Sequence, residues 1–244
     1  MIIEQIFYGI TTAVTLFLTV LTLQRLLSGW WREYYLLALI LVLTLAGVVP
    51  PITSFVSNGN WSLPSAQRMY WALALCFEVA IFLFVLQLIY RIGRELPHQA
   101  SLIRLLTLAS LVAAAVSVVA HMDKRPNIFM ASVTRDLTFM AAVLNMILWR
   151  FILKLRKRDV LMLSVSAGLG IQCTGDALGH SLRILARQIG SATVIYDFGN
   201  VIISLAAVMT IAIWHTAFSR RKFPAENSGR ASLNVTGDTR ESSV

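Results

Sequence analysis

The run YLLALILVLTLAGVVPPITSFVS, residues 35–57, contains 23 residues and no charged side chain. A helix rises about 1.5 Å per residue, so about 20 apolar residues cross the hydrocarbon core of a bilayer. Six further apolar stretches of similar length fill most of the 244-residue chain. The sequence therefore predicts an all-α integral membrane bundle of seven transmembrane helices, over 3–24, 35–57, 69–91, 102–121, 131–153, 160–182 and 190–216.

The overall composition agrees with this class of protein. The chain is 57% hydrophobic and 14% charged, with a mean hydropathy of +0.71. A soluble domain carries roughly a quarter charged residues, so the main solvent of this chain is expected to be lipid. We expect one seven-helix transmembrane domain over residues 1–222. The remaining segment, 223–244, is polar and rich in Ser, Gly, Asn and Thr, and is expected to form a disordered cytoplasmic tail.

Basic residues are distributed unequally between the two sides of the predicted bundle. If the amino terminus lies outside, 15 of the 21 Lys and Arg residues fall in inner segments and 6 in outer ones. Because cytoplasmic loops carry the excess of basic residues, we expect an external amino terminus and a cytoplasmic carboxyl terminus, in a cell or inner membrane. Four residues of the inner face form a basic cluster that could meet anionic lipid or a cytoplasmic partner. They are Lys154, Arg156, Lys157 and Arg158.

The net charge of +9 does not indicate nucleic-acid binding. The basic residues stand at the ends of apolar segments, where long cationic side chains reach the lipid headgroups, and they form no recognition face. The two cysteines, Cys76 and Cys173, lie inside apolar segments and provide no disulfide framework. Expected partners are therefore the lipid bilayer and a small ligand, with no nucleic acid.

Ionisable residues inside the apolar segments are the best pointers to a functional site, because each costs several kcal/mol unless it is paired or hydrated. In the predicted orientation they lie between the outer interface and roughly the midplane. The inner half of the bundle is nearly free of them. These residues are Glu78, Arg135, Asp136, Asp176, His180 and Asp197.

Helical spacing places several of these residues on common faces. Gln172, Asp176 and His180 recur every four residues, and Asp197 and Asn200 are three apart. Residues three or four apart share a helix face, and a polar face avoids lipid by turning inward. We therefore expect an outward-opening polar pocket between the segments 69–91, 131–153, 160–182 and 190–216. Its expected lining is Glu78, Arg135, Asp136, Gln172, Asp176, His180, Asp197 and Asn200.

A purely structural role for the same residues stays open. Interhelical hydrogen bonds between polar side chains stabilise membrane bundles by roughly 0.6 to 2 kcal/mol each, so the polar network could lock the helices and bind nothing. Gly175 and Gly179 are spaced as a small-xxx-small pair, which favours close helix packing.

Two cofactor chemistries can be weighed from the residues. A retinal Schiff base needs a lysine in the middle of the last helix, but Lys124, Lys154, Lys157 and Lys222 all flank the apolar segments, so no retinal is expected. Asp176 and His180 could share a metal ion at helical spacing. No HExxH motif is present, and a metal site is not predicted.

The sequence favours a membrane sensor or receptor-like module. Its pocket would bind a small ligand or a proton and pass the change to the inner face. The alternative is a small-solute or proton-coupled transporter with Glu78, Asp176 and Asp197 as protonatable groups. A metal-dependent membrane enzyme is a third reading. The identity of the ligand does not follow from these residues.

Overall fold

The computed structural model describes residues 2–58, 64–95, 100–123, 126–154, 159–189 and 193–220. This part of the chain folds into seven long helices and contains no strand. The prediction of an all-α membrane bundle is confirmed. The helices are α1 (Ile2–Leu27), α2 (Tyr35–Asn58), α3 (Pro64–Glu95), α4 (Ala100–His121), α5 (Pro126–Lys154), α6 (Val160–Ile189) and α7 (Thr193–Arg220).

The predicted boundaries agree closely with the observed ones. Six of the expected segments lie within observed helices, and the last observed helix begins at Thr193 and ends at Arg220 instead of spanning 190–216. α2 continues past Pro50 and Pro51 to Asn58, so these prolines do not end it. In the part of the chain that the structure describes, six helices are long and apolar enough to span a membrane, and α2 adds a shorter apolar stretch over Tyr35–Val49. The chain is a multi-pass membrane protein.

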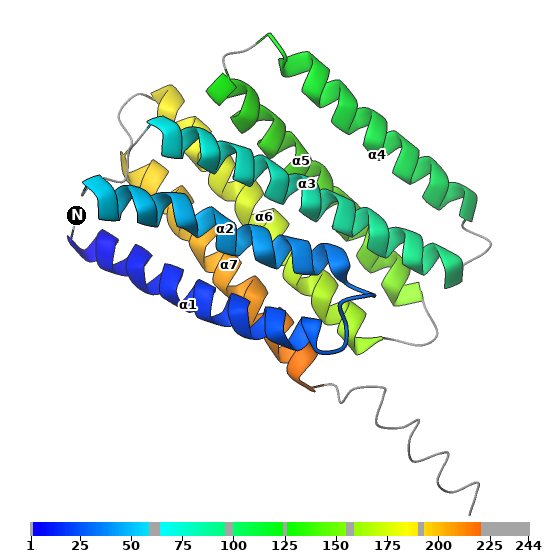
Figure 1. The fold of residues 1–244 in the computed structure, drawn as a ribbon. Helices are drawn as coiled ribbons and strands as arrows, with labels where there is room; N and C mark the ends of the chain where they lie inside the picture. The colour runs from blue at the N-terminus through cyan, green and yellow to red at the C-terminus, as the bar shows by residue number, and fades with distance from the viewer. Residues whose placement is uncertain are drawn as a thin grey trace, which may run out of the picture.

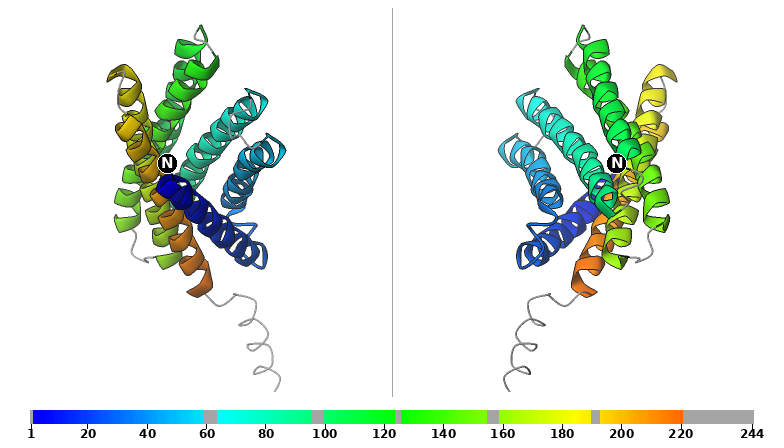
Figure 2. Two further views of the ribbon diagram at one scale, coloured as in Figure 1. Left: turned by 90° about the vertical axis from the view of Figure 1, so that its left-hand side faces the viewer. Right: turned by 90° about the vertical axis from the view of Figure 1, so that its right-hand side faces the viewer.

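Six of the helices form a closed ring. Within the described residues, α1 packs on α2, α2 on α3, α3 on α5, α5 on α6, α6 on α7, and α7 on α1. α3 also contacts α6 across the ring. α4 lies outside the ring, against α5 and α3, as two directions of view show (Figures 1 and 2). Successive helices run in opposite directions (Figure 1), as the short connections require.

The most extensive contact joins α6 and α7, and glycines permit it. A methyl group at Gly175 would collide with Ala206, and one at Gly179 would lie 2.7 Å from the carbonyl oxygen of Gly199. Without side chains at these positions, the two backbones approach closely. This close approach determines which residues of α6 face the interior of the ring.

Candidate functional site

The polar stripe of α6 points into a cavity of about 210 Å³ inside the ring. Gln172, Asp176 and His180 all line it, and Glu78 joins them from α3. Four of the eight predicted pocket residues are therefore brought together. Besides α3 and α6, helices α2, α5 and α7 contribute to the wall through Leu43, Thr44, Gly47, Thr134, Ile203 and Ala207.

Two carboxyl groups line one end of this cavity, which we call the acidic cavity. The side chains of Glu78 and Asp176 belong to residues that are only 4% and 3% exposed, and the two groups interact electrostatically. Gln172 Nε2 donates a hydrogen bond to Asp176 Oδ2 at 2.6 Å. No Lys or Arg among the described residues forms an ion pair with either acid. Because a buried charge without a counterion is very costly, this pair requires a proton or a cation.

Two polar atoms around the acidic cavity have no hydrogen-bond partner among the described residues. They are Glu78 Oε2 and Thr134 Oγ1, and both are buried. The hydroxyl of Thr138 lies beside Glu78, but it already donates to the carbonyl oxygen of Thr134 at 2.8 Å. A hydroxyl has one hydrogen to donate, so Thr138 can serve the Thr134 carbonyl oxygen or the Glu78 carboxylate but not both. A hydrogen on the Glu78 carboxyl would let both contacts form.

The opposite end of the acidic cavity is basic. Arg183 lines it seven residues after Asp176, which is about 10 Å along the helix axis. Its Nη2 donates to the hydroxyl oxygen of Tyr196 on α7 at 3.0 Å, and its guanidinium lies 5.0 Å from the centre of the same ring. Tyr196 thereby holds Arg183 at the end of the cavity nearer the carboxyl terminus of α6.

Below the acidic cavity, toward the amino terminus of α6, polar groups satisfy one another. Asn145 Nδ2 donates to the Ser166 carbonyl oxygen at 3.2 Å, and Ser166 Oγ donates to Asn145 Oδ1 at 3.0 Å. On the other side of α6, Thr210 Oγ1 donates to the Gly168 carbonyl oxygen at 3.0 Å. Trp214 Nε1 donates to the Val165 carbonyl oxygen at 3.1 Å. These bonds close this half of the ring.

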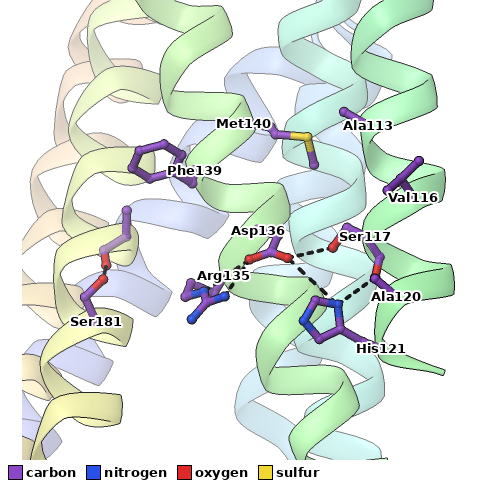
Figure 3. A pocket seen from close by; sticks show the side chains of 11 residues that line it. Ala113, Val116, Ser117, Ala120, His121, Arg135, Asp136, Phe139, Met140 and Ser181 are labelled. Carbon is purple, nitrogen blue, oxygen red and sulfur yellow. Dashed lines mark hydrogen bonds and ion pairs between the residues drawn. The ribbon is translucent and has the colours of Figure 1, made fainter. Parts of the chain in front are cut away.

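Arg135 and Asp136 lie in a different place from the acids of the ring. They line a groove of about 560 Å³ between α4, α5 and α6, which we call the lateral groove (Figure 3). Arg135 Nε and Nη2 donate to Asp136 Oδ1 at 3.1 and 2.9 Å. Ser117 on α4 donates to Asp136 Oδ2 at 2.8 Å. The expected single pocket is thus divided between two sites.

His121 completes the polar end of the lateral groove. Its Nδ1 lies 2.7 Å from the Ser117 carbonyl oxygen and 4.0 Å from Asp136 Oδ2. A catalytic triad would need the imidazole between the serine hydroxyl and the carboxylate. Here the serine hydroxyl bonds the carboxylate directly, so the arrangement does not activate Ser117 as a nucleophile.

Asp197 and Asn200 line neither the acidic cavity nor the lateral groove. Both are half-buried on α7. α7 instead turns Ile203 and Ala207 into the acidic cavity. The residues Arg156, Lys157 and Arg158 and the predicted tail 223–244 lie outside the described residues, whereas Lys154 is exposed at the end of α5.

Some residues of the acidic cavity were not predicted from the sequence. Thr134 was missed because a threonine in an apolar helix normally bonds its own backbone, although its i, i+4 spacing to Thr138 was a usable signal. The participation of α2 through Thr44 and Gly47 was also missed, since that segment carries no ionisable residue.

No cluster of three or more His, Cys, Asp or Glu side chains able to hold a metal ion occurs within the described part of the chain. Comparisons with protein families, with curated proteins and with solved structures find no match for this chain.

Proposed function

We propose that the protein is a membrane sensor or receptor-like module in which the acidic cavity binds a proton or a small cationic ligand. The site combines two buried carboxyl groups at one end with Arg183 at the other. A ligand with a cationic group would place that group between Glu78 and Asp176, where its positive charge would act as the counterion of the carboxyl groups. A proton would serve the same purpose.

The observation that carries this proposal is the pair of buried polar atoms without partners. Glu78 Oε2 and Thr134 Oγ1 belong to residues that line one cavity, and a native core rarely leaves such groups unsatisfied. A purely structural network would give both atoms a hydrogen-bond partner. Asn145 and Ser166, which lie closer to the amino terminus of α6, are paired in this way. The acidic cavity therefore has the chemistry of a binding site.

A sensor is favoured over a transporter by the closed half of the ring. Among the described residues, Asn145, Thr210 and Trp214 all use their donor groups for hydrogen bonds to helix carbonyl oxygens in the half toward the amino terminus of α6. A transporter needs access from both sides of the membrane, and this arrangement supports access from one side only.

The excess of basic residues supports a location in a cell or inner membrane, with the amino terminus outside and the carboxyl terminus in the cytoplasm. In that orientation the acidic cavity lies in the outer half of the membrane. The signal would reach the inner face near Lys154, and the neighbouring basic cluster would meet a cytoplasmic partner.

The test uses the full chain in lipid nanodiscs and the proton as the probe. Infrared difference spectra between mildly acidic and mildly alkaline buffer report the carbonyl band of protonated carboxyl groups. The wild type is expected to show this band, and Glu78→Gln and Asp176→Asn are each expected to remove part of it. After correction for the intrinsic pH dependence of amide exchange, the protection against hydrogen–deuterium exchange at the carboxyl-terminal end of α5 should change with pH in the wild type and not in the variants.

Asp197→Asn serves as the matched control because Asp197 lies outside both sites. It should leave the pH-dependent exchange unchanged. If proteoliposomes show proton or solute flux that disappears in Asp176→Asn, the transporter reading is correct instead. Spectra and exchange that are identical in the wild type and both acid variants would mean that the acids have only a structural role.

A further inference from the structure

The lateral groove is open to the bilayer along one side, and it lies apart from the acidic cavity. Two of its lining residues, Val116 on α4 and Phe139 on α5, are 59% and 64% exposed. In a protein that spans a membrane, apolar side chains exposed on the outer face of the bundle contact lipid tails. A molecule that enters this groove therefore comes from the bilayer.

The position of α4 makes the groove wide enough for a ligand. Among the described residues, α4 contacts α5 and α3 but not α6, and it buries only Ile103 and Ser117. Several of the side chains that line the groove from α4 and α6 are small. They are Ala113 and Ala120 on α4 and Ala177 and Ser181 on α6. The volume of about 560 Å³ falls in the range of roughly 300 to 1,000 Å³ typical of ligand pockets.

The polar end of the groove offers hydrogen-bond donors. A guanidinium has five N–H donors, and the bonds from Arg135 to Asp136 use two of them. The Arg135 side chain is 42% exposed. His121 Nδ1 carries the hydrogen because its neighbour, the Ser117 carbonyl oxygen, can only accept, which leaves Nε2 as an acceptor for a ligand hydroxyl.

The depth of this end suits a lipid headgroup. His121 is the last residue of α4, and Arg135 lies in the early part of α5, so both stand toward the end of the helices. Ala113 and Met140 lie deeper along the same two helices (Figure 3). The groove is thus polar toward the membrane surface and apolar toward its interior, as a lipid molecule is.

We propose that the lateral groove binds an anionic membrane lipid. The headgroup phosphate oxygens accept hydrogen bonds from Arg135, a headgroup hydroxyl donates to Nε2 of His121, and one acyl chain lies along Val116, Phe139 and Met140. Charge-assisted bonds from a guanidinium to phosphate oxygens are among the strongest hydrogen bonds in proteins, and an anionic headgroup brings no cationic group that Arg135 would repel.

The experiment reconstitutes the full chain in nanodiscs of phosphatidylcholine that contain a phosphatidylglycerol analogue with a photoreactive acyl chain. After illumination, mass spectrometry of peptides locates the attached lipid. The expected labels lie at Val116, Phe139 and Met140. Unlabelled phosphatidylglycerol should compete with this labelling, and unlabelled phosphatidylcholine should not.

Four variants separate binding from folding. Arg135→Gln removes the headgroup donors and should lower the labelling about tenfold. Asp136→Asn keeps the positive charge and frees the guanidinium, so labelling should be kept or increased. Ala113→Phe fills the apolar part of the groove and should abolish labelling there. Met146→Phe changes a residue on α5 that is 74% exposed and outside the groove, and should have no effect.

Several results would overturn the proposal. Equal losses in Arg135→Gln and Asp136→Asn would show that the ion pair is only structural. Equal competition by the two lipids would remove the role of the charge. Competition by glycerol phosphate would point to a soluble anion, and cross-links between two protein molecules across the groove would point to a second copy of the chain. If Ala113→Phe does not fold, the competition in the wild type decides.

Discussion

Asn145 and Ser166 bond each other twice between α5 and α6, whereas Glu78 Oε2 and Thr134 Oγ1 have no partner among the described residues. Both pairs are buried in the same ring. The difference between them is the physical basis for assigning a structural role to the first pair and a binding role to the second. Polarity inside the membrane is by itself not a functional signal, but incomplete hydrogen bonding around a cavity is.

At the residue scale we predict a measurable coupling between Asn145 and Ser166. Asn145→Ala and Ser166→Ala each remove one partner of the same pair, so the double variant should lose less stability than the sum of the singles. The expected coupling energy is about 0.6 to 1.7 kcal/mol, the range found for hydrogen bonds within membranes. Reversible unfolding in mixed detergent micelles measures it. Strictly additive losses would show that the two side chains act independently.

Among the elements, α6 and α7 depend on glycine for their contact, while α4 is held by few buried groups. At Gly179 of α6 and Gly199 of α7 the two helix backbones are in close contact. A methyl group at either glycine would lie within 2.8 Å of the carbonyl oxygen of the other. α4 is tied to α5 by the Ser117–Asp136 hydrogen bond and packs loosely elsewhere. The close contact of α6 with α7 positions the polar stripe of α6, and the loose packing of α4 leaves the lateral groove open.

At the element scale we predict that Gly179→Ala destabilises the bundle by about 1 to 3 kcal/mol, because the new methyl group would meet the Ile203 side chain and also the Gly199 carbonyl oxygen, which is backbone and cannot rotate away. Gly9→Ala is the control. A Cβ at Gly9 has no neighbour within 4 Å, so this change should be neutral or should stabilise by about 0.5 to 1 kcal/mol through helix propensity. The same detergent unfolding measures both variants. Similar stabilities for the two would show that α6 and α7 can separate at little cost.

At the scale of the whole molecule, the described residues form a ring of six helices with a seventh on its outer side, and they line two sites that differ in access. The acidic cavity lies inside the ring, and the lateral groove lies between the ring and α4. Both are formed by the amino-terminal half of α5 and the carboxyl-terminal half of α6. In the orientation indicated by the basic residues, both belong to the outer half of the membrane.

At this scale we predict the orientation itself. A cysteine introduced at Asp123, after α4, should react with a membrane-impermeant maleimide in intact cells. One introduced at Lys154, at the end of α5, should react only after the membrane is permeabilised. Both positions are exposed in the structure, so accessibility to solvent does not bias the comparison. The reverse labelling pattern would place the acidic cavity in the inner half and would invert the direction of the proposed signal.

The sequence by itself determined the class of the protein, the number of helices and the common face of Gln172, Asp176 and His180. Length, apolarity and helical spacing are local properties, and they follow from a helix rise and period that do not depend on neighbours. Only the tertiary structure separated Arg135 and Asp136 from the buried acids, moved Asp197 and Asn200 away from the cavity and brought Thr134 to it. These placements depend on how each helix is rotated against its neighbours, and that rotation is decided by close packing at small residues such as Gly175 and Gly179 and by the position of α4 outside the ring.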